Sequence, residues 1–435
     1  MVQPTTLETP PSPADHRELN GRVIWALVLL GILYGFNTVD RGLLALNLEQ
    51  IKLDLHATDT QMSVAAGIGF FLFNAIAGIP LARLADRHSR RDIIAIGFGF
   101  YSLVVGLVGM VSSFAGLLVA RMVQGVGEAS GVAPASAMVN DLVSPRNRRK
   151  ALAGMRVFSS LIVMVMLSAL GQVAHVYGWR ASFYVLAVPA ALLVPLMLFT
   201  VREPKRETTF SGQVVARVTF REAWSRWRHS PAFFMVLLGF AISGVTLQAN
   251  GAWAGAFFAR VRELSPGEIG ALSGLSRGPG LLAGSIIGAW LTDFLTRRNH
   301  RWRFWVPGLM LILGTPTELI YLMADPYWIW MPAYLVTGGL LLGSQASLIA
   351  VCMDVSGIGL RATGLAFAIL LSNLLADLVG PTIIGVMNDT VFSHFGAVAL
   401  RYSMALTACF AAVGGALVFG GAFFESEQTR SDRSS

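Results

Sequence analysis

Charged residues are scarce in this chain of 435 residues. Lys, Arg, Asp and Glu together make up 13% of the sequence, whereas hydrophobic residues make up 54%. Soluble domains usually carry about 25% charged residues. This composition excludes an ordinary soluble protein and predicts an integral membrane protein.

Cysteine is nearly absent, and the sequence motifs of several enzyme classes are missing. The two cysteines, Cys352 and Cys409, both fall in apolar segments, so no disulfide framework is expected. The seven histidines are scattered near expected loops and segment ends, without metal-ligand spacing. The chain also lacks a phosphate-binding Gly-Lys-Ser/Thr loop, a hydrolase nucleophile elbow and a metalloprotease motif. We therefore expect no enzyme activity, no cofactor, no metal and no direct use of ATP.

Apolar segments long enough to cross a membrane, which takes about 20 residues, are abundant. Twelve such segments are expected, and a polar break over 202–231 divides them into two sets of six. The break contains 220–229, where tryptophan and arginine are mixed; this pattern fits either a helix on the inner membrane surface or a plain linker. The expected segments are 22–48, 60–85, 92–113, 115–141, 149–173, 179–201, 231–259, 267–295, 303–324, 327–353, 361–388 and 398–424.

The expected domains follow from this division. They are a tail at 1–21, a six-helix bundle at 22–202, a linker at 203–230, a second six-helix bundle at 231–424 and a tail at 425–435.

Positive charges gather in alternate loops. Arginine and lysine are dense after the second, fourth, sixth and eighth segments and sparse in loops such as 112–116, 324–327 and 388–397. The positive-inside rule then places both termini in the cytoplasm and the protein in the cell (inner) membrane as a multi-pass chain. The net charge of +8 belongs to these loops, so no nucleic-acid partner is expected.

The loop at 82–91 reads ARLADRHSRR and resembles the signature loop of the major facilitator superfamily. A weaker copy, GAWLTD at 288–293 followed by Arg297 and Arg298, stands at the same place in the second half. The resemblance implies an all-α membrane protein with the major facilitator fold, about twelve transmembrane helices in two pseudo-symmetric six-helix bundles. It also implies a charge clasp that holds the cytoplasmic side shut, because an aspartate can meet a helix N-terminus or an arginine of the other bundle. The expected gate residues are Asp86, Arg87, Arg90, Arg91 and Asp293.

Ionisable residues stand inside the apolar segments. Asp40 and Arg41 are adjacent in the first segment, and Arg121 and Glu128 lie seven residues apart on one face of the fourth. A charge in the hydrocarbon core costs roughly 2.5–3.5 kcal/mol, so such residues are expected to face a bundle interior and to have partners. We predict one polar cluster where the first and fourth helices meet, with Asp40 and then Glu128 as the proton-coupling groups.

Several stretches together resemble the spinster-like branch of this superfamily. Besides Asp40-Arg41 and the loop at 82–91, they are 59–61 (DTQ), 125–129 (GVGEA), 134–135 (PA), 178–180 (GWR), 202–204 (REP) and 253–260. The anion:cation symporter branch shares the Asp-Arg and Gly-Glu-Ala elements. The spinster-like resemblance implies secondary active transport, with eukaryotic relatives that move lysophospholipids or sphingosine phosphate.

Other polar residues in the segments are candidates to contact the substrate. Arg156 fits either an anion-binding role or a side chain that snorkels to the inner boundary, and Arg277 lies deeper in apolar sequence. Thr315, Thr317 and Glu318 cluster around Pro316 and are interpreted as structural. The expected substrate or charge partners are Arg41, Arg121, Arg156, Arg277, Asn37, Gln248, Asn250, Trp253, Asn373 and Asp377.

The sequence favours a proton-coupled transporter of amphipathic or lipid-like organic molecules, of lysophospholipid or sphingolipid type or drug-like. Two alternatives stay open: a proton-linked symporter of small organic acids such as sugar acids, and a membrane receptor that binds ligand without transporting it. The expected partners are a small-molecule or lipid substrate, protons and membrane lipids, with the chain acting as a monomer.

Overall fold

The computed structural model describes residues 20–144, 147–203, 220–357 and 359–424. These ranges contain helices and no β-strand. Ten helices within them are long and apolar enough to cross a membrane. Both predicted tails, 1–21 and 425–435, and most of the predicted linker lie outside the described residues or at their edge.

The N-terminal half begins with a helix that extends beyond the predicted 22–48, and two of its predicted segments are interrupted. The second segment breaks at Gly67, where a Cβ atom would lie 2.8 Å from the carbonyl oxygen of Asp377, so a close backbone approach requires glycine. The fourth breaks at Ser130, whose hydroxyl donates to the Gly127 carbonyl at 2.7 Å and competes with the helical pattern. The helices are α1 (Gly21–Asp54), α2 (Asp59–Ala66), α3 (Ile68–Arg87), α4 (Arg90–Val108), α5 (Phe114–Ala129), α6 (Val132–Leu142), α7 (Arg148–Tyr177) and α8 (Trp179–Thr200).

The C-terminal half repeats this plan. Its predicted segment 267–295 is built from three pieces, a short helix, a π-helical stretch and a longer helix. The predicted loop 388–397 contains the start of a 3-10 helix, η3 (Ser393–Val398). The helices are α10 (Pro231–Val261), α11 (Pro266–Ala271), the π-helical η2 (Leu272–Ser276), α12 (Arg277–Thr296), α13 (Trp302–Met323), α14 (Tyr327–Val355), α15 (Arg361–Asp389) and α16 (Ala399–Gly421).

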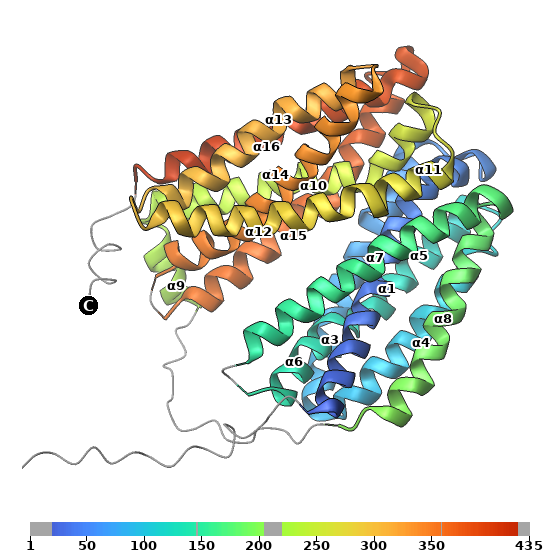
Figure 1. The fold of residues 1–435 in the computed structure, drawn as a ribbon, viewed down its shortest axis with the longest axis horizontal. Coiled ribbons are helices and arrows are strands. Elements are labelled where there is room, and N and C mark those ends of the chain that lie inside the picture. The colour runs from blue at the N-terminus through green and yellow to red at the C-terminus, as the bar shows by residue number, and fades with distance from the viewer. Residues whose placement is uncertain (1–19, 145–146, 204–219, 358, 425–435) are drawn as a thin grey trace, which may run out of the picture.

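The two halves form separate bundles that meet at one end. Figure 1 shows the blue-to-green helices of the N-terminal half gathered beside the yellow-to-red helices of the C-terminal half. The most extensive contacts between the halves join α1 to α10, α2 to α15 and α7 to α11. We call the end where the α1–α2 connection meets the end of α10 the closed end. The halves diverge toward the other end, which carries α6 and α9 and is called the open end (Figure 1).

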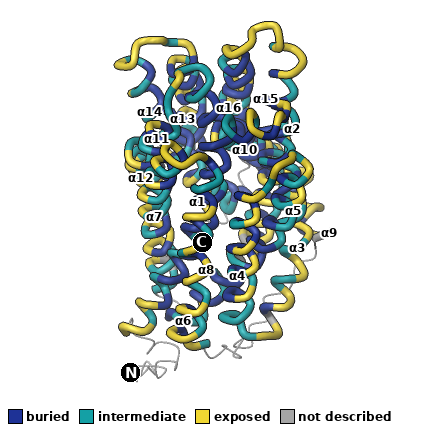
Figure 2. The backbone as a smooth tube through the Cα atoms, turned by 90° about the vertical axis from the view of Figure 1, so that its right-hand side faces the viewer, coloured by how far each residue is buried: buried dark blue, intermediate teal, exposed yellow. Residues whose placement is uncertain are grey.

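The central helices are the most buried. In Figure 2, α10 runs through the upper part of the molecule as a mostly dark blue, buried segment, while the outer helices carry exposed faces. Exposed apolar side chains such as Ile96, Leu192 and Ile286 stand on those outer faces. Such faces suit a protein whose surrounding solvent is lipid rather than water.

A short helix, α9 (Phe220–Trp227), precedes the C-terminal bundle within the predicted linker. Its Trp227 is buried, stacks on Phe233 with ring centroids 4.6 Å apart and donates its indole N–H to the Ser356 carbonyl at 3.2 Å. Trp224 on the same helix is 42% exposed. The helix is therefore attached to the C-terminal half, and its position on the membrane surface stays a prediction.

Candidate functional site

A cavity of about 430 Å³ lies between the two halves. Most of its wall is apolar and comes from α1, α3, α7, α10 and α12, with Phe71, Val163, Leu247 and Leu281 among the lining side chains. Polar groups interrupt that wall at a few points. They include Arg41 and Arg121 from the N-terminal half and Gln248, Arg277 and Tyr334 from the C-terminal half.

The first polar group joins α1 to α5. Asp40 is fully buried, and Arg121 donates to its Oδ2 at 2.9 Å and to Gln124 Oε1 at 2.6 Å. The second carboxylate oxygen of Asp40, Oδ1, has no hydrogen-bond partner among the described residues. The first and fourth predicted segments thus meet, as expected, through an ion pair between Asp40 and Arg121 that is buried from solvent.

A second ion pair joins the same two helices, with the arginine on α1 and the carboxylate on α5. Arg41 of α1 pairs with Glu128 of α5, and its Nε also donates to Glu128 Oε2 at 3.3 Å. Glu128 is 2% exposed, whereas the Arg41 side chain is 40% exposed and reaches the cavity. Phe70 separates the two guanidinium groups, which lie 5.2 Å (Arg41) and 4.5 Å (Arg121) from its ring centroid. Cation–π contact of this kind stabilises a cation that has left water.

The C-terminal half contributes two further polar groups. Gln248 lines the cavity and donates a hydrogen bond to Asp377, which is buried behind it on α15. Arg277 begins α12, lies over the Tyr334 ring at 4.5 Å and donates to the Tyr334 hydroxyl at 2.9 Å. Gln248 thus has a buried carboxyl behind it, whereas Arg277 and its partner Tyr334 both line the cavity.

Behind Arg277 lies a buried carboxyl, Glu318, which the sequence analysis interprets as structural. Glu318 is fully buried and accepts a hydrogen bond from Asn250 Nδ2 at 2.9 Å. The Asn250 Oδ1 faces Arg277 Nη2 at 3.4 Å. A carboxylate inside an apolar segment is the signal that singled out Asp40, and the same signal applied to Glu318 would have found it.

The remaining predicted substrate partners lie away from the cavity wall. Trp253 is buried and donates its indole N–H to the Pro381 carbonyl at 3.0 Å, which ties α10 to α15. Asn37 is buried near the Asp40 cluster. Arg156 and Asn373 are exposed and do not line the cavity, and exposure at Arg156 fits the snorkelling alternative.

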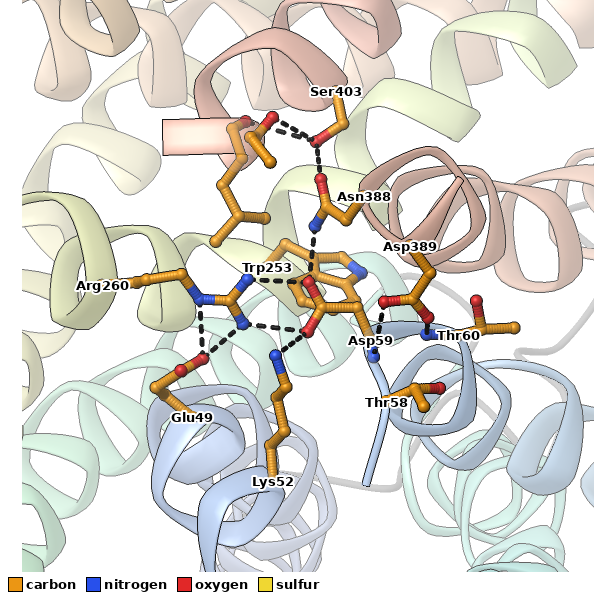
Figure 3. A network of polar contacts seen from close by, with 12 residues as sticks. Glu49, Lys52, Thr58, Asp59, Thr60, Trp253, Arg260, Asn388, Asp389 and Ser403 are labelled. Atoms are coloured by element: carbon orange, nitrogen blue, oxygen red, sulfur yellow. Dashed lines mark hydrogen bonds and ion pairs between the residues drawn. The ribbon is translucent and has the colours of Figure 1, made fainter. Parts of the chain in front are cut away.

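The closed end is held by a network of charges that the sequence did not reveal (Figure 3). Arg260, at the end of α10, donates from Nη1 to Asp59 Oδ2 at 2.7 Å and from Nε to Glu49 Oε2 at 3.0 Å. Lys52 Nζ lies 2.6 Å from Asp59 Oδ1, and Asn388 Nδ2 donates to Asp59 Oδ2 at 2.9 Å. These five residues, which we call the latch, join α1 and α2 to α10 and α15 across the two halves.

A helix terminus completes the latch. Asp389, at the end of α15, accepts from the backbone N–H of Thr60 at 2.7 Å and from that of Asp59 at 3.3 Å. A carboxylate at a helix N-terminus satisfies free N–H donors and interacts favourably with the helix dipole. The first turn of α2 is thus docked on the other half by both side-chain and backbone bonds.

The predicted gate residues belong to the open end, and their contacts stay within one half. The Asp86 side chain lies outside the described part of the structure. Arg90 pairs with Asp141 of α6, while Arg91 donates to the Leu198 carbonyl at 3.3 Å. Arg87 and Asp293 are exposed. None of these described contacts joins the two halves, as the separation of the bundles at the open end requires.

Glu203 caps the start of α4 at the open end. Its carboxylate accepts from the Arg90 N–H at 2.9 Å, the Arg91 N–H at 2.8 Å and the Ser89 hydroxyl at 3.1 Å. Because three donors lose their acceptor, we expect Glu203→Ala to destabilise the fold by about 1–2 kcal/mol. The measurement is the thermal unfolding midpoint in detergent, with Glu263→Ala, at an exposed carboxylate after α10, as the control. An unchanged midpoint would contradict this cap.

The described residues contain no group of three or more His, Cys, Asp and Glu that could hold a metal ion. The arginine, carboxylate and amide side chains at the cavity can bind charged or hydrogen-bonding groups.

The sequence is similar to a known protein family and to several known proteins. The family model of the Major Facilitator Superfamily matches residues 30–381. An MFS-type efflux pump of Mycolicibacterium smegmatis is 28% identical over 394 residues, covering 90% of this chain and 91% of the relative. Protein spinster homolog 1 of Xenopus tropicalis is 24% identical over 432 residues, covering 93% of this chain and 82% of the relative.

A solved structure agrees with the fold. The crystal structure of a bacterial homologue of the human lysosomal transporter Spinster, in an inward-facing and unoccupied conformation, superposes with a TM-score of 0.83. The two sequences are 21% identical, and the match covers 96% of this chain and 100% of the other. The predicted fold and the predicted resemblance to the spinster-like branch are both confirmed.

Proposed function

The chain belongs to the major facilitator superfamily, a family of transporters rather than enzymes, and from that premise we propose that it carries amphipathic organic molecules by proton-coupled alternating access. A central site between two bundles that rock against each other is the arrangement by which such transporters work. The cavity between the halves, latched at one end, supports this proposal.

The observation that carries the proton coupling is the pair of crossed ion pairs, Asp40–Arg121 and Arg41–Glu128. A buried carboxylate beside an arginine remains ionised, but one that loses its arginine takes up a proton, because an isolated ion in an apolar setting is costly. Arg41 reaches the cavity, so a substrate that draws its guanidinium away would leave Glu128 without its partner. Asp40 and Glu128 are the proposed proton-binding groups.

The lining of the cavity supports an amphipathic substrate. Its wall is largely apolar, and its arginines suit a carboxylate or phosphate group. The resemblance to the spinster-like branch implies lysophospholipid or sphingolipid-like molecules, and the similarity to an MFS-type efflux pump agrees with an organic molecule that is exported. The arginines also suit small sugar acids, which is the second candidate. Direct binding with a panel of lysophospholipid, drug-like cation and organic acid separates the two.

The orientation follows from the loop charges. We place the open end in the cytoplasm, both termini on that side and the protein in the inner membrane as a monomer. The proposed bundle limits are 22–202 and 231–424.

The test is Asp40→Asn in proteoliposomes, using the best ligand from the panel. Asparagine keeps an acceptor for Arg121 but cannot exchange a proton, so proton-driven uptake should fall at least tenfold. Substrate exchange without a proton gradient should continue. The matched control is Asp54→Asn on the same helix, since Asp54 is 41% exposed in an ion pair with Arg180.

Two outcomes would count against this function. Unchanged uptake with the same pH profile in Asp40→Asn would remove Asp40 from proton coupling. Ligand binding without flux in the unaltered protein would favour a receptor over a transporter.

A further inference from the structure

Arg277 differs from the other arginines of the cavity in its partners. Arg41 and Arg121 each pair with a carboxylate of their own half. Arg277 makes no ion pair with any described residue, and its hydrogen bonds go to the Tyr334 hydroxyl and to Asn250 Oδ1. Its side chain lines the cavity. A guanidinium at a cavity wall that has no carboxylate partner is a binding group for an anion.

The nearest carboxylate to Arg277 in this network is Glu318, and the side-chain amide of Asn250 lies between the two. Asn250 presents its oxygen to Arg277 and its nitrogen to Glu318 Oε1, at 3.4 and 2.9 Å. Asn250 is 1% exposed and Glu318 is 0% exposed, so water does not screen their interaction. The other oxygen of Glu318, Oε2, is buried and has no partner among the described residues. The carboxylate is thus held by a single donor beside a cation that it does not touch.

This arrangement responds to an arriving anion. With the site empty, Arg277 offsets the charge of Glu318 through Asn250. An anion bound to Arg277 would leave two negative charges and one positive charge in a dry pocket, which is unfavourable unless one negative charge is neutralised. Glu318 Oε2 is the bare position where a proton can add.

We propose that Arg277 binds the anionic group of an amphipathic substrate and that Glu318, coupled to it through Asn250, takes up one proton as the anion arrives. The proton comes from the solution and forms an O–H bond at Glu318 Oε2, so the anion and the proton add no net charge to the pocket. This third proton-binding group belongs to the C-terminal half and acts apart from Asp40 and Glu128. It rests on the proposed function only in taking the cavity as the substrate site.

The position of Arg277 also links this site to the movement of the halves. Arg277 directly follows the π-helical η2, a local geometry often found at functional sites. Within η2, a Cβ atom at Gly274 would lie 2.3 Å from the Met164 carbonyl oxygen of α7, so the two halves touch here backbone to backbone. A rotation of one half against the other would shift the element that carries Arg277.

Few other ionisable groups face Glu318. Arg277 and the hydroxyls of Tyr321 and Tyr334 surround it from α12, α13 and α14, and Asn250 is the uncharged contact from α10. The ionisable groups on α16 are Arg401, which bonds to Asp325 at 2.7 Å, and Tyr402 and Cys409, both exposed.

The test measures proton uptake on binding. Octanesulfonate is the probe, because it is an amphipathic anion that does not titrate near neutral pH. Titration calorimetry of the full-length protein in buffers of different ionisation enthalpy gives the number of protons taken up. We expect about one in the unaltered protein, with a Kd that rises up to tenfold per pH unit, because binding and protonation are linked.

Single substitutions test whether proton uptake depends on Glu318 and whether affinity for the probe depends on Arg277. Glu318→Gln should still bind the probe, with no proton uptake and a flat pH dependence of Kd. Arg277→Gln should lose at least tenfold in affinity. Glu263→Gln, at an exposed carboxylate after α10, is the control and should behave as the unaltered protein. Uptake that persists in Glu318→Gln, or affinity that persists in Arg277→Gln, would overturn the proposal.

If Glu318→Gln does not fold, Asn250→Ala tests the coupling between Arg277 and Glu318. Asn250→Ala leaves Glu318 in place but removes its link to Arg277, so proton uptake should fall; full uptake would overturn the proposal. These binding results are independent of flux. Glu318-dependent uptake without transport would contradict the proposed function alone, whereas transport of cations with no octanesulfonate binding would contradict this inference alone.

Discussion

Replacing Arg260 by alanine will open the closed end of the molecule and shift the protein toward the opposite-facing conformation. The guanidinium is shared by Glu49 and Asp59, and the three side chains are 12%, 15% and 3% exposed. Removing one partner of a buried ion pair costs about 3–5 kcal/mol, and here Glu49 is left without its cation while Asp59 keeps Lys52. Each 1.4 kcal/mol is a factor of ten, so the closed-to-open ratio at this end should fall by about a hundredfold or more.

Distances between spin labels on the two halves measure this change. Leu53, 65% exposed at the end of α1, and Glu263, exposed just after α10, take the labels after Cys352 and Cys409 are replaced. The unaltered protein should give one short distance, and Arg260→Ala should add a longer one that dominates. A distribution that stays short would show that the latch does not hold this end.

Two further variants separate the latch from general effects. Arg262→Ala removes an arginine two residues along, whose partners Asp325 and the Tyr321 and Ala324 carbonyls all lie in the C-terminal half. It should leave the distance unchanged. Adding Glu49→Gln to Arg260→Ala removes one uncompensated carboxylate, so the double variant should be less open than the sum of the single effects.

The Arg262 control is insensitive to pH in the neutral range. The hydrogen bond from Arg401 holds the pKa of the Asp325 carboxyl below its usual value. A carboxyl whose pKa is lower in the folded state than in the unfolded state stabilises the fold at any pH above its unfolded-state pKa. This stabilisation is lost only as the pH falls through the folded-state pKa. Measurements between pH 6 and 8 therefore leave this ion pair intact.

The sequence predicted the helices and the cavity arginines better than it predicted the contacts between halves. Asp40 and Arg121 are recognisable because a charge inside an apolar segment needs a partner, and each segment offers few. The latch could not be found in this way. Arg260 and Asp59 stand at segment ends, where charges are ordinary, and 201 positions separate them along the chain. Their pairing depends on how two bundles close, which no local pattern encodes.

The local context of Glu318 in the sequence favours a structural interpretation. Glu318 follows Pro316 and two threonines, and this neighbourhood suggested hydroxyls satisfying a kinked backbone. Thr315 does donate to the Ala408 carbonyl at 3.1 Å. Glu318 lies three residues further on, on the same face of α13, and accepts a hydrogen bond from Asn250 of α10. The partner from another helix is what the local sequence pattern does not encode.

Replacing Gly255 by alanine will also prevent the closed end from forming, but for a steric reason. A Cβ atom at Gly255 of α10 would lie 2.2 Å from the Ala45 carbonyl oxygen and 3.0 Å from the Leu46 Cα of α1. Both are backbone atoms inside a buried helix and cannot rotate away. Alanine is the better helix former by about 1 kcal/mol, so α10 itself should remain intact.

The distance between the spin labels at positions 53 and 263 measures the result. Gly255→Val and Gly255→Leu introduce progressively larger side chains at the same position. Overpacking usually costs about 1–3 kcal/mol, and a contact this short against backbone should exceed that range. We expect the long distance to dominate in Gly255→Ala already. Gly251→Ala, one turn earlier on α10, is the matched control, because a Cβ there meets no atom within 4 Å.

Comparing the steric change with the charge change tests whether one contact surface holds the closed end. Gly255 and Arg260 both bring α10 against α1, so either substitution should release the same movement. Once Gly255→Ala has opened this end, Arg260→Ala should add little to the long-distance population. If Gly255→Ala kept the short distance and the full unfolding temperature, α1 and α10 would not need their backbone contact, and the latch alone would have to hold the two halves together.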